Sequence, residues 1–288
     1  STPHGMNMFY KLWTDAEEKR NSYVPIEVHW SEVPGRDDKW KKETIANTSQ
    51  SQFNTEFECE FLGSIDTLIT SSKLKTLTYK TPIQSNAGLD VYEQPQKDHT
   101  YFMCADVSRG TSNDYSAYLV FDVTQVPYRI VAKFRDNTIK PLMFPQKIYH
   151  VARAYNQAFV LIEVNDIGEQ VANAMQFDLE YDNLVMATMR GRAGQIMGGG
   201  FSGGKAQLGV RTTKAVKKIG CSNLNQMVED NNLIVEDYDC INELSTFIVK
   251  GSSFEADEGC NDDLVACMFI FSWMTDQSYF KELTGETF

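Results

Sequence analysis

The sequence contains few of the residues that build disulfide frameworks or zinc sites. Its six cysteines include no CxxC pair, and its four histidines do not stand at ligand spacing from them. Several cysteines lie inside apolar runs, as Cys104 does in Phe102–Ala105. This pattern favours reduced thiols in the core of a cytosolic protein. It argues against a structural zinc site.

Long apolar runs are also absent. The longest, such as Leu264–Trp273, are too short to cross a bilayer. Ser1–Gly5 has neither the basic nor the apolar region of a signal peptide, and the missing initiator methionine predicts a fragment of a longer chain. The 288 residues are 42% hydrophobic and 12% aromatic, which is typical of a globular protein. We expect one domain of roughly 200 residues with an appendage.

Acidic residues are missing from one segment. Residues 189–220 contain seven Lys or Arg and no acid, so the rest of the chain carries a charge of −19, seven below the net charge of −12. The negative total argues against a protein whose whole surface binds nucleic acid. A local contact with the DNA backbone would explain the segment, and a solvated mobile loop would have the same composition. The candidate DNA-binding residues are Arg190, Arg192, Lys205, Arg211, Lys214, Lys217 and Lys218.

The first sixty or so residues predict an appendage: a helix over 6–20, a strand over 26–30 and a polar, helix-prone stretch over 37–57. A turn-rich stretch covers 81–100. Three apolar strands follow, joined by short turns and therefore antiparallel. The expected order is strands at 101–105, 115–123 and 128–134, helix 144–156, strand 159–162, helix 169–181, strand 184–188, helix 213–229, strand 233–235, a helix or strand within 242–250, and helix 262–275.

This order predicts an α/β fold of the RNase H-like class. Three antiparallel strands would be followed by parallel strands that cross over through helices, giving a mixed central sheet flanked by helices.

Two acids follow strands whose other residues are all apolar. Asp106 ends the run Tyr101–Ala105, and Glu163 ends Phe159–Ile162. Burying a carboxylate without a partner costs on the order of several kcal/mol. Each of these two side chains must therefore reach water, a cation or a metal. On neighbouring central strands the two would repel each other unless a divalent cation lay between them. The sequence therefore predicts a metal site at this edge of the sheet.

A third acid, Asp263, opens the apolar helix expected at 262–275. An aspartate at a helix start can simply cap free N–H groups. Since Asp262 precedes it, Asp262 can be the cap while Asp263 faces the site. Asp114 and Asp262 are further possible ligands. Carboxylates without His or Cys favour Mg²⁺, for which Mn²⁺ can substitute, and a pair of such ions supports phosphodiester hydrolysis.

The Gly-rich stretch Gly199–Ala206 has the G-x-x-x-x-G-K spacing of a phosphate-binding loop. Ala206 replaces the Ser or Thr hydroxyl that such loops use to bind Mg²⁺, and no helix begins at once in Gln207–Gly209. We therefore expect no ATP site in this fragment. A Gly-rich arm that follows a DNA backbone is the preferred interpretation.

Several motifs, in order along nearly the whole chain, resemble the C-terminal part of the large terminase subunit, the DNA-packaging motor, of T4-like tailed bacteriophages. They are Ser1–Gly5 with Phe9–Tyr10, Asp106–Gly110 with Asp114–Tyr115, Leu161–Asn165, Lys214–Val216 leading to Gly220–Ser222, and Asp262–Val265.

The resemblance implies an RNase H-like endonuclease that cuts concatemeric double-stranded viral DNA when packaging begins and when the capsid is full. It puts the catalytic, metal-binding triad on Asp106, Glu163 and Asp263. It assigns residues 1–61 to the end of the ATPase region and linker, and 62–288 to the nuclease domain. The partners implied are DNA, the portal protein, the ATPase domain of the same chain and the small terminase subunit. The location implied is the host cytoplasm, at the procapsid portal.

Two positions depart from the family pattern: Arg109 stands where relatives can have an acid, and Asn261 where His often precedes the two aspartates. Two alternatives stay open. One is another RNase H-like nuclease of resolvase or integrase type, against which the motor-like opening segment argues. The other is a non-catalytic portal-docking domain whose acids bind a structural cation.

Overall fold

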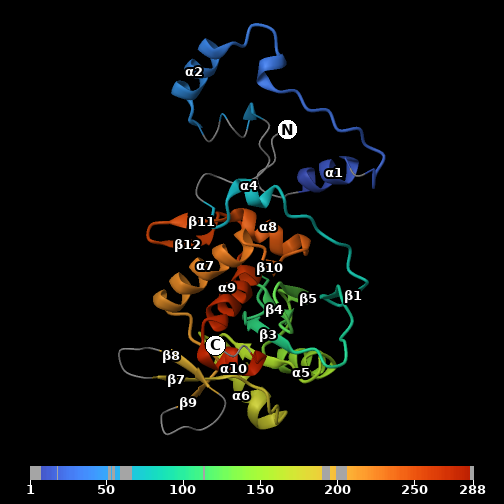
Figure 1. Cartoon of the computed structure of the whole chain (residues 1–288), viewed down its shortest axis with the longest axis vertical. Coiled ribbons are helices and arrows are strands. Elements are labelled where there is room, and N and C mark those ends of the chain that lie inside the picture. Colours follow the sequence, from blue (N-terminus) through green and yellow to red (C-terminus); the bar gives the residue numbers. More distant parts are fainter. Residues whose placement is uncertain are drawn as a thin grey trace. The chain divides into compact units, whose positions relative to one another are not determined.

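The computed structural model describes residues 8–17, 19–50, 53, 56–58, 67–112, 114–189, 195–198 and 206–285. Its contacts divide the chain into two units (Figure 1): Ser1–Leu77 with Ile241–Cys260, and Thr78–Cys240 with Asn261–Phe288. The domain boundary predicted after residue 61 lies within 59–66, outside the described residues, and stays a prediction.

The described residues of the first unit form short helices and a β-hairpin. Trp30, Trp40, Phe53 and Phe57 form a small aromatic core, with ring centroids 5.3 to 6.0 Å apart. Its elements are α1 (Met8–Glu17), the 3₁₀ helix η1 (Trp30–Glu32), α2 (Asp38–Asn47), α4 (Ser71–Leu74), β11 (Phe247–Lys250) and β12 (Ser253–Ala256). α1 and α2 confirm helices within 6–20 and 37–57.

The strand predicted over 26–30 is wrong. Residues 23–29 have no regular structure, and the 3₁₀ turn η1 begins at Trp30. Of the apolar side chains in this stretch, Ile26 and Val28 are exposed, whereas Trp30 is buried against Trp40 and Phe53. Pro25, just before the stretch, has no N–H to give to a neighbouring strand.

The second unit is built on a mixed sheet with strand order β1-β2-β5-β4-β3-β6, and β10 pairs with β5. The three central strands are antiparallel, and β6 joins β3 in parallel. This confirms the predicted RNase H-like architecture. The strands are β1 (Gln84–Asn86), β2 (Leu89–Val91), β3 (Tyr101–Asp106), β4 (Ser116–Asp122), β5 (Tyr128–Asp136), β6 (Phe159–Ile162) and β10 (Leu233–Ile234).

Alternate residues of β3 enter two separate cores, as the two-residue period of a strand requires. Tyr101, Met103 and Ala105 belong to the core formed with α5 (Phe144–Ala154), α6 (Gly168–Asn173) and the π-helix η2 (Ala174–Asp178). On the other face, the Phe102 ring lies 6.1 Å from that of Phe271 in α9 (Asp263–Thr275). The same alternation puts Asp106 on the α9 face.

α9 is apolar on every side because it is enclosed by the sheet and another helix. The Phe271 ring stacks on Phe121 of β4 at 3.9 Å and 5°. On its other side α9 packs along α7 (Lys214–Glu229) (Figure 1). A Cβ at Gly220 would overlap with the Phe269 carbonyl oxygen, so only glycine allows this close approach. Every residue from Asp263 to Met274 is buried.

Two further elements differ from their predicted form. The helix expected over 169–181 divides into α6 and the π-helix η2. The strand expected over 184–188 meets the main sheet at its start, where Leu184 bridges Val160 and the Val185 amide donates to the Val160 carbonyl oxygen. Its continuation β7 (Met186–Met189) lies in a second sheet between β8 (Gln195–Gly198) and β9 (Ala206–Leu208).

The stretch 242–250, left open as helix or strand, is both. α8 (Tyr238–Thr246) ends where β11 begins, and the boundary between the two units falls inside α8. α10 (Ser278–Thr284) completes the second unit. No helix of the described residues is long and apolar enough to span a membrane. Among the described cysteines, all but Cys260 are buried thiols, as predicted, and Cys59 lies outside the described residues.

Candidate metal centre

Asp106 and Glu163 lie next to each other at the ends of two paired strands. Asp106 is the last residue of β3, and Glu163 directly follows β6, whose Ile162 pairs with Ala105. The Glu163 amide donates a hydrogen bond to the Ala105 carbonyl oxygen at 2.9 Å. Two carboxylates from neighbouring parallel strands therefore share one edge of the sheet, as the sequence predicts.

The Asp106 carboxyl group is electrostatically unfavourable in its charged form. Burial raises its pKa well above the ordinary value, and the charge of Glu163 raises it further. A hydrogen bond between the two carboxyl groups and the charge of Asp263 act in the same direction. Burial and the neighbouring negative charges therefore favour the protonated form of Asp106. A bound cation would favour its charged form.

Asp263 reaches the same region from the start of α9. Its side chain is buried, and the Tyr115 amide donates a hydrogen bond to its Oδ1 at 3.2 Å. Its other oxygen, Oδ2, is buried without a hydrogen-bond partner in the described part of the chain. Burial raises the pKa of Asp263 to about 7; Asp262 and Asp114 contribute to the rise, and Arg135 opposes it. Asp262 holds the N-cap position, without a side-chain capping bond.

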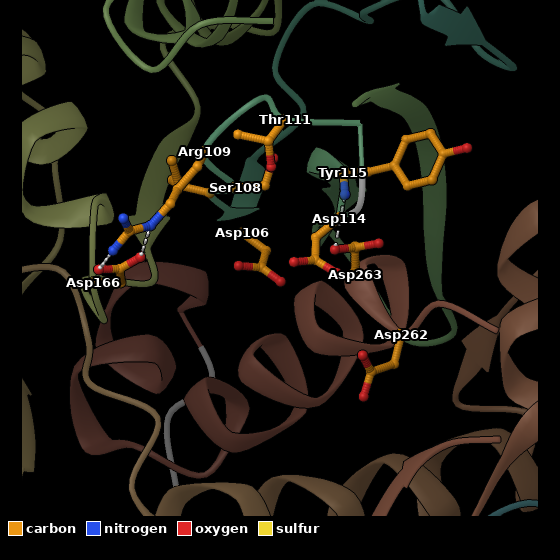
Figure 2. A pocket seen from close by; sticks show the side chains of 10 residues that line it. Asp106, Ser108, Arg109, Thr111, Asp114, Tyr115, Asp166, Asp262 and Asp263 are labelled. Carbon is orange, nitrogen blue, oxygen red and sulfur yellow. Dashed lines mark hydrogen bonds and ion pairs between the residues drawn. The ribbon is translucent and has the colours of Figure 1, made fainter. Parts of the chain in front are cut away.

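A cavity of about 420 Å³ opens at this edge of the sheet (Figure 2). Four of the predicted acids line it: Asp106, Asp114, Asp262 and Asp263. Figure 2 draws Asp106 with Asp114 and Asp263 on one side of it and the Arg109–Asp166 pair on the other. Glu163 does not line the cavity, and it reaches the site through its contact with Asp106.

The residues present fit a hard divalent cation. Carboxylate oxygens are the ligands that Mg²⁺ and Mn²⁺ prefer, and a buried carboxylate oxygen without a partner is the atom that a cation would satisfy. Among the residues that the structure describes, no three His, Cys, Asp or Glu side chains converge at metal-ligand distance. The site therefore has the right donors and charge, and a bound cation would draw the Asp263 and Glu163 side chains closer together.

The sequence was compared with models of known protein families. The family model of the terminase RNase H-like domain matches residues 103–272, more than half of the chain. The chain belongs to the terminase RNase H-like domain family. The match begins in β3 and ends in α9, so it includes all three predicted triad residues.

Solved structures of terminase nucleases share the fold. The large terminase nuclease from thermophilic phage G20c with bound magnesium matches with a TM-score of 0.55 and 18% identity over 73% of this chain and 98% of that one. The cobalt-bound form gives 0.54 and 20% over the same shares. The zinc-bound form gives 0.50 and 19% over 72% and 96%. The more specific resemblance to T4-like phages stays a prediction.

One side-chain amide and one backbone amide hold two of the candidate acids in place. The Asn165 side-chain amide donates to Glu163 Oε1 at 2.9 Å and to the Thr212 carbonyl oxygen at 3.3 Å. The Tyr115 amide fixes Asp263, as described above. The sequence did not single out either contact, since both partners are ordinary polar residues whose role depends on which loops meet.

The predicted DNA-binding residues are only partly described. Arg190, Arg192 and Lys205 lie outside the described residues, as does nearly all of the Gly-rich stretch. Arg211 is exposed and lies 3.8 Å from Glu169. Lys214, Lys217 and Lys218 belong to the first turns of α7, as expected, and the Lys217 ammonium lies 5.8 Å from the Phe269 ring centre. Their contact with DNA stays a prediction.

Proposed function

We propose that this chain is a Mg²⁺-dependent DNA endonuclease that cuts concatemeric double-stranded viral DNA when genome packaging begins and when it is complete. One observation carries the proposal: Asp106, whose pKa is raised by burial and by Glu163 and Asp263, borders a cavity that Asp263 also lines. One buried oxygen of Asp263 has no hydrogen-bond partner among the described residues. Membership of the terminase family supplies the substrate class. It also favours this reading over a resolvase or integrase.

In this proposal the acids act as ligands and not as proton donors. Asp106, Glu163 and Asp263 hold the cation, with Asp114 and Asp262 as possible additional ligands. A bound divalent cation supplies Lewis acidity for hydrolysis of a phosphodiester bond. Asn165 holds the Glu163 carboxylate, and the Tyr115 amide holds one oxygen of Asp263 so that the other stays available. Burial of Asp263 strengthens its attraction for a cation by excluding water.

The proposed partners follow from the family and not from a contact in this chain. They are double-stranded DNA, the portal protein, the small terminase subunit and the ATPase domain of the same chain. The proposed location is the host cytoplasm, at the procapsid portal. We propose that no ATP site belongs to this fragment.

Plasmid cleavage tests the proposal. Supercoiled DNA should be cut with Mg²⁺ or Mn²⁺ and stay intact with EDTA. Asp106→Asn, Glu163→Gln and Asp263→Asn should each abolish cutting because each removes a ligand charge, while the melting temperature stays near that of the wild type. Asp98→Asn is a matched control: Asp98 is exposed, precedes the opposite end of β3, and has a positive φ of 69° that Asn tolerates.

Intact plasmid under every metal, with a folded protein, would contradict the endonuclease proposal. It would favour a portal-docking domain whose acids bind a structural cation. Cleavage that survives all three substitutions would instead place the chemistry elsewhere in the chain.

A further inference from the structure

Arg109 is the only basic residue among the described residues that line the acidic cavity. The other charged lining residues are all aspartates: Asp106, Asp114, Asp166, Asp262 and Asp263. A cavity of this charge repels a polyanion, and a small cation cannot neutralise all of it. A phosphate that enters the cavity therefore needs a positively charged side chain, and among the described lining residues Arg109 can supply it.

Asp166 holds the Arg109 guanidinium along one edge. Arg109 Nε donates to Asp166 Oδ2 at 2.7 Å, and Nη2 donates to Oδ1 at 2.6 Å. Nη1 makes no hydrogen bond within the described part of the chain, so its two N–H groups and one on Nη2 are available. Figure 2 shows this pair beside Asp106. A guanidinium fixed at one edge offers the other to a second two-oxygen acceptor.

Glycines in the two loops that carry the pair pack closely against neighbouring backbone. A Cβ at Gly110, next to Arg109, would overlap with the Ile139 carbonyl oxygen, and one at Gly168 would overlap with that of Glu163. The first loop follows Asp106 at the end of β3, and the second follows Glu163, the residue after β6. The position of Arg109 is therefore set by the same backbone that positions the metal site.

Stability alone does not account for the pair. The two side chains are 67% and 58% exposed, and exposed ion pairs contribute little to folding, about 0–1 kcal/mol. A bidentate pair at the mouth of a cavity is better explained by what it presents to a ligand. Arginine suits this task because its planar group matches the oxygens of a phosphate.

We propose that Arg109 binds a backbone phosphate of the DNA substrate next to the metal site, and that Asp166 is its positioning residue. The inference rests on the proposed nuclease function, because it assumes a phosphodiester substrate in this cavity. The competing explanation is a latch: the pair would merely hold the two loops together, and any opposite-charge pair would do.

Binding without cleavage tests the proposal first. In an Asp106→Asn background, affinity for a short labelled DNA duplex is measured by fluorescence anisotropy at increasing KCl. Arg109→Gln should weaken binding about tenfold, the effect of a charge-assisted contact, and reduce the salt slope by about 1. Asp166→Asn should weaken binding less, because the guanidinium stays but is less ordered. Arg153→Gln, which removes an exposed arginine from α5, is the control and should change nothing.

The exchange Arg109→Asp with Asp166→Arg separates a phosphate contact from a latch. It keeps an opposite-charge pair but moves the cation to the other loop, so a phosphate contact predicts that binding stays weak. In cleavage assays, where Asp106 is intact, Arg109→Gln should raise KM for the DNA substrate. Arg109→Lys should partly restore it. Full recovery in the exchanged variant, or an unchanged salt slope in Arg109→Gln, would overturn the proposal. Absence of cleavage by the wild type would instead count against the nuclease function itself.

Discussion

Two groups of acids in the second unit differ in whether a basic side chain accompanies them. Asp90, Asp237 and Asp239 surround the buried Lys133 ammonium at 3.0, 2.8 and 2.6 Å. Asp106, Glu163 and Asp263 form no ion pair with a Lys or Arg in the described residues. The first group contains its own cation, and the second lacks one.

The pKa shifts express the same contrast. Burial lowers the pKa of Lys133, but the charges of Asp237 and Asp239 raise it by more, so the charged form of the lysine is favoured. At the cavity, burial and mutual repulsion raise the pKa of Asp106 and Asp263, so these acids tend to keep protons. Arg135 lies between the groups: its Nη1 is 3.8 Å from Asp239, and its charge lowers the pKa of Asp263. The first cluster holds its own lysine, and we propose that the second receives a divalent cation.

Removing the internal cation should have the largest effect on folding. Lys133→Met leaves the buried Asp237, and the half-buried Asp90 and Asp239, without their shared cation, which should lower the free energy of unfolding by about 3–5 kcal/mol. Urea denaturation measures the loss. Lys39→Met, which removes an exposed lysine from α2, is the control and should cost almost nothing. A Lys133→Met protein as stable as the wild type would contradict the structural role of this cluster.

Adding the missing cation should stabilise the cavity cluster. Mg²⁺ at about 100 times its Kd should raise the free energy of unfolding by about 2.7 kcal/mol, or roughly 5–10 °C in melting temperature. Differential scanning fluorimetry with and without EDTA measures the shift. Asp106→Asn should remove most of it, whereas Lys133→Met should keep it despite its lower baseline. An equal shift in wild type and Asp106→Asn would mean that Mg²⁺ acts elsewhere.

The smallest effect concerns pH without metal. Below the ordinary aspartate pKa, Asp263 is protonated in the folded and in the unfolded chain. Between that pKa and the folded-state pKa of about 7, the unfolded chain loses the proton and the folded chain keeps it. Stability should therefore fall as pH rises through this window, by about 1–3 kcal/mol. Asp263→Asn should lack this component, so the variant becomes relatively more stable at pH 8 than at pH 5. Parallel stability curves for the two proteins would refute the raised pKa.

The central strands and their terminal acids could be predicted because the signal is local. Apolar runs before Asp106 and Glu163 mark buried strands, and short turns fix their direction. β1 could not be predicted because its residues are polar and exposed, and it forms a strand only by pairing with β2. β2 has only three residues, too few to show an alternation, and it pairs with β5. The strand expected over 26–30 is wrong for a different reason: Ile26 and Val28 are exposed, and Trp30 packs with Trp40 and Phe53 instead of joining a sheet.

The side-chain partners were harder to predict than the acids themselves. Lys133 is visible as a charge inside an apolar strand, but its aspartates come from β2 and from the start of α8, far along the chain. The Arg109–Asp166 pair joins residues 57 positions apart through two loops whose meeting depends on the β3–β6 pairing. Sequence patterns identify the acids that need a cation, and only the fold identifies what surrounds them.

The most direct test is a crystal of the chain grown with Mn²⁺ and measured at the manganese absorption edge. The account predicts an anomalous peak between Asp106 and Glu163, with carboxylate oxygens of both at about 2.2 Å and Asp263 Oδ2 turned toward the ion. Well-ordered crystals saturated with Mn²⁺ but with no peak there, and with Asp106 still hydrogen-bonded to Glu163, would contradict it.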